Sequence, residues 1–449
     1  MDKLFGTDGV RGVANLFPMD VETAMAIGKA VAGYFWDPSR ITKGHIVIGQ
    51  DTRLSGDMLA QAVAAGACSV GVDVSFLGVL PTPGIAHATV ATGAMAGVVI
   101  SASHNPFEDN GIKIFDARGY KLFDEVEAQI EAIISNGKKA RAAGSLQIGR
   151  VRQGDDAQAH YIDFLIQNLK GCDLKKIRIA VDCANGATFE VAPELFKRLG
   201  AMVFSMGCDP DGTNINHLCG SQHPQRLAQL VIEKSADLGL AFDGDGDRLI
   251  AVDEKGRVLT GDQIMAIIAK DFHERGTLKN SAVVATVMSN MGLRAALQQM
   301  NIELLTTQVG DRYVLQKMLE ADAVLGGEDS GHMIIRNAHT TGDGIMAALH
   351  LIEAMQRAGQ PLSKLSEVMT IFPQKLINVD VKSKPDLTTI PEIGRAIAQA
   401  ENSLGDKGRV LVRYSGTQNK CRVMVEGPTR EQTDALCGKI AVAIQRMIG

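Results

Sequence analysis

Aromatic residues and positive charge are both scarce in this 449-residue chain. Phe, Trp and Tyr make up 4% of it, and 46 Lys and Arg stand against 51 Asp and Glu, which gives a formal net charge of −5. A protein that binds DNA or RNA needs a basic surface, usually with aromatic side chains on which bases stack. We therefore expect no nucleic-acid partner, and any anionic substrate must be bound by local clusters of Arg and Lys.

Paired cysteines and long apolar runs are also absent. The number of cysteines is odd, and none forms a CxxC pair. The cysteines stand at positions 68, 172, 183, 208, 219, 421 and 437. Free thiols in a reducing cytosol are the expected state, so a cytoplasmic location is predicted. The opening MDKLFGTDGVRG is not expected to be a signal peptide, and no stretch is apolar for the length of a membrane span, so we expect no membrane partner.

A strand–helix–strand pattern occurs three times along the chain. The copies cover residues 45–78, 176–207 and 281–310, and each has two short β-rich runs around an amphipathic helical segment. Such units build mixed or parallel sheets covered by helices. The stretch after Pro373 differs, because its β-rich runs suggest an antiparallel sheet. The predicted fold class is α/β, with three similar mixed α/β domains and a C-terminal α+β domain.

A chain of this length exceeds what one hydrophobic core usually supports, so several domains are expected. Candidate linkers are the Gly-, Lys- and Arg-rich segment 136–150, the turn 253–257, and the segment around residues 372–373. The predicted domains are residues 1–150, 151–254, 255–372 and 373–449.

Three aspartates alternate with glycines in DGDGDR (243–248), between the apolar run LGLAF and the strand RLIAVD. Carboxylates this close repel one another, and a divalent cation offsets the repulsion. All-oxygen ligands from Asp243, Asp245 and Asp247 favour a hard ion such as Mg²⁺. The spacing also resembles a calcium loop, but Arg248 occupies the position where that loop needs Gly. A solvated acidic turn is the alternative to a magnesium site.

A small polar loop, SASHNP (101–106), follows the apolar strand AGVVI. Open α/β sheets bind ligands at the carboxyl ends of their strands. A hydroxyl such as that of Ser103 beside His104 can serve as a nucleophile or as a phosphorylation site. Ser and Asn also build caps and turns, so the loop alone leaves a structural role open. Lys113 lies in the next strand, where a solvated lysine is the alternative.

Two further polar segments have the composition of ligand-binding loops. GGEDSGH (326–332) places Glu328 and Ser330 between glycines, where they can hold sugar hydroxyls, although an ordinary hairpin turn is equally consistent. RYSGT (413–417) combines an Arg, hydroxyls and a Gly-exposed backbone, which are components of a phosphate cradle. A basic hairpin tip is the alternative there. Arg11, in GTDGVRG near the start, can also meet a phosphate.

Taken in order, GTDGVRG, SASHNP, DGDGDR, GGEDSGH and RxSGT resemble the α-D-phosphohexomutase family along the whole chain. The resemblance implies four domains around a central cleft, the first three sharing a fold. The first would carry a phosphoserine loop, the second a metal-binding loop, the third a sugar-binding loop and the fourth a phosphate-binding loop. GTDGVRG and E-x-S-G-H are similar to the bacterial branch that acts on glucosamine phosphates.

The resemblance also implies a role for each motif residue, with Ser103 rather than Ser101 as the phosphorylated serine. The implied catalytic residues are Ser103, His104, Lys113, Arg11 and Arg248. The implied ligands of one Mg²⁺ per chain are Ser103, Asp243, Asp245 and Asp247. The implied substrate-binding residues are Glu328, Ser330, His332, Arg413, Ser415, Gly416, Thr417, Asn419 and Arg422.

The C-terminal motif departs from the family pattern, which usually has Pro after the Arg and Glu-Pro after the Thr. Tyr414, Gln418 and Asn419 occupy these positions here. The groups that bind phosphate remain, which favours binding. The rigidity of the loop is in question, because two prolines that lock φ are missing.

The reaction that the resemblance implies begins with phosphoryl transfer from Ser103 to glucosamine 6-phosphate. The resulting glucosamine 1,6-bisphosphate turns around and returns its other phosphate, leaving glucosamine 1-phosphate for UDP-N-acetylglucosamine and cell-wall synthesis. Mannose or glucose phosphate are alternative substrates of the same mechanism. A metal-dependent sugar phosphatase and a non-catalytic sugar-phosphate sensor are alternatives of other classes, although a hydrolase has no use for a second phosphate cradle at Arg413. The expected partner is a small phosphosugar, and a homodimer is left open.

Overall fold

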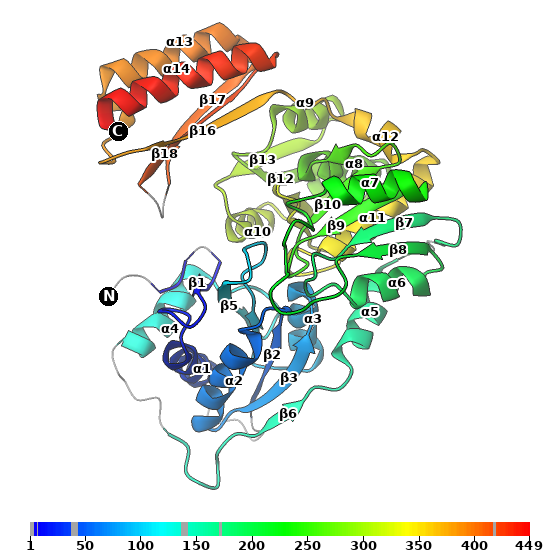
Figure 1. Cartoon of the computed structure of the whole chain (residues 1–449), viewed down its shortest axis with the longest axis vertical. Helices are drawn as coiled ribbons and strands as arrows, with labels where there is room; N and C mark the ends of the chain where they lie inside the picture. Colours follow the sequence, from blue (N-terminus) through cyan, green and yellow to red (C-terminus); the bar gives the residue numbers. More distant parts are fainter. Residues whose placement is uncertain (1–3, 7, 37–43, 136–141, 170–172, 416–418) are drawn as a thin grey trace. The chain divides into compact units, whose positions relative to one another are not determined.

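A computed structural model of the chain describes residues 4–6, 8–36, 44–135, 142–169, 173–415 and 419–449. The chain forms two compact units (Figure 1). One consists of Met1–Met288 and Asn301–Val368, and the other of Ser289–Met300 and Met369–Gly449. The predicted linker 136–150 lies partly outside the described residues. Among the helices that can be described, none combines the length and the hydropathy that a membrane crossing requires.

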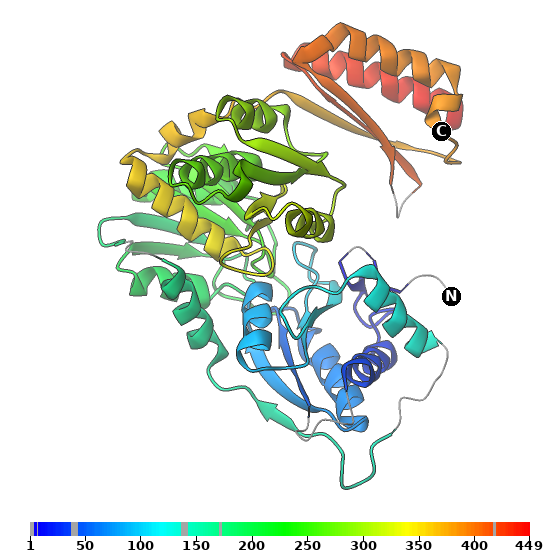
Figure 2. The same cartoon turned by 180° about the vertical axis from the view of Figure 1, so that it is seen from behind.

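The first sheet has six strands in the order β1-β5-β4-β2-β3-β6. The strands are β1 (Val10–Val13), β2 (His45–Gln50), β3 (Asp73–Val79), β4 (Ala96–Ile100), β5 (Asp109–Asp116) and β6 (Val151–Gln153). β2 lies parallel to β3 and β4, whereas β5 runs antiparallel to β1 and β4. The accompanying helices are α1 (Val21–Phe35), α2 (Gly56–Ser69), α3 (Thr82–Ala91), α4 (Asp124–Ser135) and α5 (Ala157–Asn168). Figure 2 shows α1 and α2 on one side of these strands and α3 on the other.

The second and third sheets complete the first unit. The second has the order β11-β10-β9-β7-β8 and the third β13-β12-β14-β15. Their strands are β7 (Arg178–Asp182), β8 (Met202–Met206), β9 (Leu238–Phe242), β10 (Leu249–Asp253), β11 (Val258–Leu259), β12 (Ala282–Thr286), β13 (Glu303–Thr307), β14 (Leu325–Gly327) and β15 (Met333–Ile335). The helices along this stretch are α6 (Val191–Arg198), α7 (Gln225–Lys234), α8 (Gly261–Glu274), α10 (Asp311–Glu320), α11 (Gly344–Ala358) and α12 (Leu362–Leu365), while α9 (Met291–Gln299) belongs to the second unit. Every residue of β4, β9, β10 and β12 is buried, as expected of apolar strands covered on both faces.

The three predicted strand–helix–strand units are confirmed. They are β2–α2–β3, β7–α6–β8 and β12–α9–β13, and in each the two strands are parallel neighbours. A parallel pair needs a crossover, which the helix between the strands provides. The repeated pattern therefore corresponds to one repeated structural unit in three different sheets.

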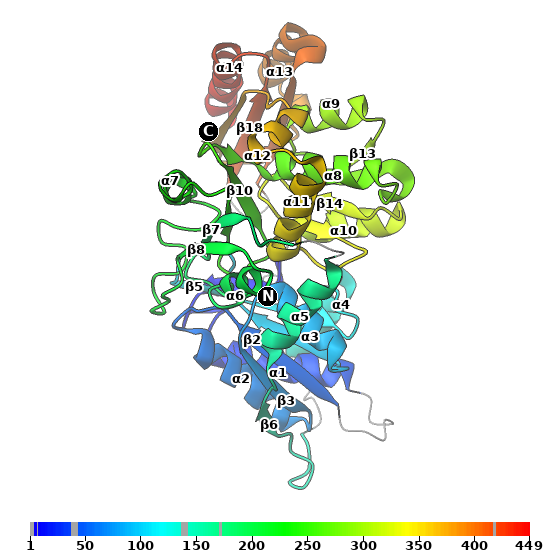
Figure 3. The same cartoon turned by 90° about the vertical axis from the view of Figure 1, so that its right-hand side faces the viewer.

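The second unit contains the predicted antiparallel sheet. Its strands are β16 (Gln374–Asp380), β17 (Arg409–Tyr414) and β18 (Lys420–Glu426), in the order β16-β18-β17. Both neighbouring pairs run antiparallel. The helices α13 (Pro391–Leu404) and α14 (Arg430–Ile448) pack together against one face of this sheet (Figure 3). The core between them includes Ile393, Val423 and Ile440.

Candidate active site

The loop that carries Ser103 begins where β4 ends, and its first residues, 101–103, are buried. Ser103 is 1% exposed and has φ of +54°, in the left-handed region that residues other than Gly rarely adopt. Its backbone N–H donates to Ser101 Oγ (3.0 Å), and Ser101 Oγ in turn donates to Asp51 Oδ2 (2.5 Å). Ser101 thus supports the strained turn that presents Ser103.

Arg53 ties this loop to the carboxyl end of β2. Its Nε donates to Asp51 Oδ2 (2.9 Å), and its Nη2 donates to the carbonyl oxygens of Ser103 (2.9 Å) and Asn105 (2.8 Å). The same two carbonyl groups accept from Asn216 Nδ2 (2.9 and 3.0 Å). Asp51, Arg53 and Asn216 were not expected from the sequence. The position of QDTR at the end of a parallel strand was the available signal.

The three aspartates of DGDGDR lie on the hairpin between the antiparallel strands β9 and β10, as the sequence predicts. Asp243, Asp245 and Asp247 are all buried, and each can place one carboxylate oxygen within 4.8 Å of the others. Ser103 Oγ donates a hydrogen bond to Asp243 Oδ2 (2.5 Å). Two motifs 140 residues apart therefore meet at one point.

The aspartate triad fits a metal ion better than a solvated turn. Burial, followed by the charges of Asp245 and Asp247, raises the pKa of Asp243 well above its ordinary value. Burial also acts to raise the pKa of Asp245, but Lys113 and a hydrogen bond from Thr82 lower it overall. Asp245 Oδ1 is buried without a hydrogen-bond partner among the described residues. Close, buried carboxylates with a free oxygen are suited to binding a divalent cation.

Lys113 lies beneath the triad and is fully buried. Its Nζ is 2.8 Å from Asp245 Oδ2, 3.1 Å from Asp8 Oδ2 and 3.8 Å from Asp247 Oδ2. Burial disfavours the charged ammonium, but Asp245 and Asp8 outweigh that effect and raise the pKa of Lys113. The side chain therefore stays a cation and is not a solvated strand lysine.

A second lysine, Lys121, extends the network and was not expected from the sequence; its side chain is 13% exposed. Its Nζ donates to Asp8 Oδ1 (2.7 Å) and also pairs with Asp311 at the start of α10. Although burial acts to raise it, Lys113, Lys121 and Arg11 hold the pKa of Asp8 well below its ordinary value. The network thus links the first sheet to α10, which packs against β12 and β14 of the third sheet.

Arg11 and His104 lie beside the serine. Arg11 pairs with Asp8, and its Nη1 donates to the carbonyl oxygen of Ala102 (3.4 Å). His104 Nδ1 is 3.3 Å from Ser103 Oγ. Burial, together with Arg248 and Arg11, lowers the pKa of His104 to about 4, so the imidazole is neutral near pH 7.

Arg248 and His332 join the second and third sheets. The two residues form an antiparallel backbone bridge, and both side chains approach Asp247 Oδ1, with Arg248 Nε at 3.8 Å and His332 Nδ1 at 3.4 Å. Burial lowers the pKa of His332, but Asp247 and then Asp311 raise it overall. Each of the two residues therefore places a basic group at the triad.

The GGEDSGH segment is a tight turn between β14 and β15. Glu328 N–H donates to the His332 carbonyl oxygen (2.9 Å), and Gly331 N–H donates to the Glu328 carbonyl oxygen (3.0 Å). Glu328 Oε1 accepts from the Gly310 N–H (3.0 Å). Ser330 Oγ is buried and has no hydrogen-bond partner within the described ranges. The segment is thus a hairpin turn, and this structure is compatible with a role in binding sugar hydroxyls.

The C-terminal loop belongs to the second unit, and its Gly416 and Thr417 lie outside the described residues. Arg413 and Arg422 are directly opposite each other on β17 and β18. Neither forms an ion pair with an acid in the part of the chain that is described, and burial together with Arg422 lowers the pKa of Arg413. Two adjacent guanidinium groups without an acid favour an anionic ligand.

Although the prolines of the family pattern are missing, hydrogen bonds hold the end of β17 in place. Tyr414 hydroxyl donates to the Pro385 carbonyl oxygen (2.7 Å), and Lys384 Nζ donates to the Ser415 carbonyl oxygen (2.8 Å). The exposed Asn419 accepts at its carbonyl oxygen from the Val381 N–H (2.9 Å). Gln418 lies outside the described residues.

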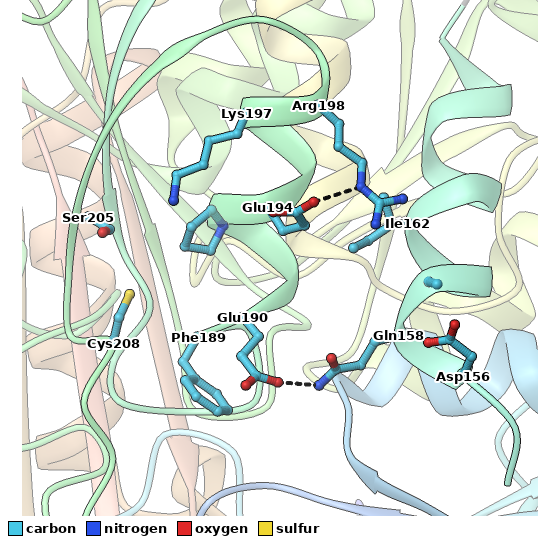
Figure 4. A pocket seen from close by; sticks show the side chains of 12 residues that line it. Asp156, Gln158, Ile162, Phe189, Glu190, Glu194, Lys197, Arg198, Ser205 and Cys208 are labelled. Atoms are coloured by element: carbon cyan, nitrogen blue, oxygen red, sulfur yellow. Dashed lines mark hydrogen bonds and ion pairs between the residues drawn. The ribbon is translucent and has the colours of Figure 1, made fainter.

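Cavities of the first unit do not all coincide with these motifs. A cavity of about 480 Å³ between α5 and α6 contains none of the residues predicted from the sequence. Figure 4 shows Lys197 and Cys208 along it, with Gln158 hydrogen-bonded to Glu190 (2.7 Å). A cavity of about 700 Å³ borders the serine loop, and His104 is among its lining residues.

Known families match the chain over nearly its whole length. The profiles described as "Phosphoglucomutase/phosphomannomutase, alpha/beta/alpha domain" I, II and III match residues 2–141, 159–256 and 260–372, and the profile of the C-terminal domain matches residues 376–443. The chain belongs to the phosphoglucomutase/phosphomannomutase family and is an isomerase of the phosphohexomutase class.

Relatives of full length bear a more specific name. Proteins of Syntrophus aciditrophicus and Syntrophobacter fumaroxidans, both named phosphoglucosamine mutase, are 53% and 52% identical over 451 residues, which is 100% of this chain and of each relative. A solved phosphoglucomutase/phosphomannomutase family protein of Burkholderia thailandensis shares the fold with a TM-score of 0.82 at 24% identity, covering 99% of this chain and 97% of its own. Aspergillus fumigatus N-acetylphosphoglucosamine mutase, solved with GlcNAc-6P and magnesium, has a TM-score of 0.67 at 18% identity, with 99% and 95% covered.

Proposed function

We propose that the chain interconverts glucosamine 6-phosphate and glucosamine 1-phosphate through a phosphorylated Ser103 and a glucosamine 1,6-bisphosphate intermediate. The observation that carries the proposal is the 2.5 Å hydrogen bond from Ser103 Oγ to Asp243, at the centre of a buried cluster of three carboxylates. A serine hydroxyl in that position is suited to carry a phosphoryl group. The names of relatives that are about half identical over their whole length support the substrate.

The residues around Ser103 supply positive charge where the transferred phosphoryl group would lie. Phosphoryl transfer depends mainly on positioning and on neutralising charge on the equatorial oxygens. Lys113 and Arg11 remain cationic and take this role, with Arg248 beside Asp247. His104, neutral and 3.3 Å from Ser103 Oγ, completes the catalytic set.

Mg²⁺ is the ion that we propose for the triad, one per chain. Asp243, Asp245 and Asp247 would hold it with the phosphate on Ser103, because all donors are oxygens. When bound, the ion would supply Lewis-acid stabilisation of phosphoryl oxygens.

Substrate binding is assigned to two loops. Glu328, Ser330 and His332 would hold the sugar hydroxyls. The buried Ser330 Oγ, which has no hydrogen-bond partner among the described residues, supports this assignment. Residues of the C-terminal loop would hold the phosphate that is not transferred. The opposite positions of Arg413 and Arg422, neither of which is paired with an acid among the described residues, support this assignment. That loop consists of Arg413, Ser415, Gly416, Thr417, Asn419 and Arg422.

We also propose the division into domains 1–150, 151–254, 255–372 and 373–449, and a cytoplasmic protein without a nucleic-acid or membrane partner. The family profiles, which begin and end near these boundaries, support the division. A homodimer remains the candidate assembly.

Turnover and intact mass together test the proposal. The purified chain is assayed in parallel with glucosamine, glucose and mannose 6-phosphates, and we expect kcat/KM to favour glucosamine about tenfold or more, the scale of one good polar contact. Mass spectrometry should find one phosphate on the chain and none on Ser103→Ala, which should not turn over. Ser101→Ala, the matched control, should keep its phosphate and part of its activity. Release of inorganic phosphate without isomer formation would instead indicate a phosphatase.

A further inference from the structure

Thr82 is the first residue of α3 and is fully buried beside the aspartate triad. Its backbone N–H donates to the Asp245 carbonyl oxygen (2.9 Å), and its Oγ1 donates to Asp245 Oδ2 (2.6 Å). Lys113 Nζ donates to the same carboxylate oxygen (2.8 Å). The other oxygen, Oδ1, is buried and has no hydrogen-bond partner among the residues that can be described.

The unequal use of the two oxygens fixes the direction of the Asp245 carboxylate. With Oδ2 held by two donors, rotation about the Cβ–Cγ bond breaks both hydrogen bonds. Oδ1 is thereby left available at the point where Asp243 and Asp247 can bring an oxygen within 4.8 Å. Hydrogen bonds to a metal-binding carboxylate orient it and tune its affinity for the ion.

Thr82 is held more firmly than Lys113. Pro81 and Pro83 flank it, and their rings restrict the backbone at the start of α3. A side chain at Gly246 would come within 3.2 Å of Pro81 Cβ, which shows how closely α3 approaches the aspartate loop. Lys113, in contrast, lies near Asp8 and Asp247 as well and can shift among three carboxylates.

We propose that Thr82 is a positioning residue of the metal site, whose hydroxyl holds Asp245 so that Oδ1 can bind a divalent cation. The inference rests on the proposed function, because it takes the triad to be the Mg²⁺ site. Thr82 begins α3, which packs against β2 and β4 of the sheet that carries the Ser103 loop, whereas Asp245 lies in the hairpin between β9 and β10 of the second sheet. The hydrogen bond between them therefore aligns the metal ligand with the sheet that carries Ser103.

Binding of Mn²⁺ to the full chain, followed by electron paramagnetic resonance and competed with Mg²⁺, tests the proposal without turnover. Thr82→Val removes the hydroxyl and keeps the shape of the side chain, and Thr82→Ser restores the hydroxyl. Thr89→Val is the matched control, because Thr89 is a buried threonine of α3 whose Oγ1 donates to the Ile85 carbonyl oxygen (2.8 Å). All proteins are compared in one phosphorylation state of Ser103, verified by intact mass.

We expect Thr82→Val to weaken Mn²⁺ and Mg²⁺ binding about ten- to a hundredfold, and Thr82→Ser and Thr89→Val to bind as the wild type does. Turnover by Thr82→Val should recover at saturating Mg²⁺. Unchanged affinity in Thr82→Val overturns the proposal, and so does an equal loss in Thr89→Val. If Thr82→Val does not fold, a loss of affinity in Thr82→Ser overturns it. Absence of Mn²⁺ binding by the wild type would instead refute the metal site itself.

Discussion

Replacing Arg53 with Met should release the loop that carries Ser103. The guanidinium group is fully buried and pairs with Asp51 through Nε (2.9 Å). Among the residues that the structure describes, its Nη atoms donate only to backbone carbonyl groups of the segment after β4. The acceptors are the carbonyl oxygens of Ser103, Asn105, Pro106 and Asp109. One side chain therefore fixes both ends of the loop and its strained residue.

The size of the effect follows from burial. Removing one member of a buried ion pair costs about 3–5 kcal/mol, because the remaining charge has no partner. Asp51 would keep the Ser101 hydroxyl, but burial already raises its pKa. We expect Arg53→Met to lower the free energy of unfolding by about 3–5 kcal/mol. A displacement of Ser103 by about 1 Å would lower kcat about a hundredfold. Arg53→Lys keeps the charge but lacks the planar fork, so its losses should be intermediate.

Arg118 provides a matched control in the same chain. In both Asp-x-Arg pairs the Arg N–H donates to Oδ1 of the Asp, and Nε to Oδ2, but the Arg118 side chain is 71% exposed. Arg118→Met should therefore cost less than about 1 kcal/mol. Denaturant unfolding and steady-state turnover, measured where every variant is folded, give the two quantities. A stability loss in Arg53→Met no larger than in Arg118→Met refutes the reasoning, and a large stability loss with unchanged kcat refutes its catalytic part.

Three further predictions concern charge. Asp243→Asn should raise the melting temperature of the metal-free protein, because burial and repulsion by its neighbours disfavour the Asp243 carboxylate. Asp245→Asn should lower the melting temperature, because Lys113 loses an ion-pair partner. Thermal unfolding in EDTA checks both. Arg413→Ala should raise KM and lower kcat together, since remote phosphate binding helps position the reacting hydroxyl, and an unchanged KM would remove this loop from the site. Burial lowers the pKa of His339 from 6.5 to about 3, so stability should fall as the pH drops below about 6.5. By linkage this loss is about 2 kcal/mol between pH 7 and pH 5, and unfolding of His339→Gln at both values should show a correspondingly smaller loss.

The strand–helix–strand units and the DGDGDR hairpin could be predicted because their signals are local. Apolar periodicity and the glycines of a tight turn lie within a few residues of one another, so neighbouring positions suffice to assign them. The loop after β4 could be located for the same reason. Its strained φ at Ser103 and its distance to Asp243 depend on the tertiary structure, and the pattern around residue 103 alone left a structural role open.

Arg53, Thr82 and Lys121 were missed because their partners are distant in the sequence. Arg53 bonds to a carbonyl group 50 positions away, Thr82 to a carboxylate 163 away and Lys121 to one 190 away. None of them belongs to a glycine-rich or histidine-containing motif. A lysine within a strand or loop also looks like a solvated one until its ion pairs are known. Only the placement of QDTR at a strand's carboxyl end was informative in advance.

The balance of charge around Ser103 explains why a metal site should lie beside the serine. The carboxylates of the network are Asp8, Asp243, Asp245, Asp247 and Asp311, and its permanent cations are Arg11, Lys113, Lys121 and Arg248. Burial and the neighbouring carboxylates raise the pKa of Asp243, and Asp247 raises the pKa of His332 although burial acts to lower it, so the charges of this network lie close to balance. A phosphate on Ser103 would add about −1.5 to −2, which the existing side chains cannot offset because each cation already faces a carboxylate. A divalent cation at the triad would restore the balance. We therefore expect the triad to bind a divalent cation more tightly when Ser103 is phosphorylated.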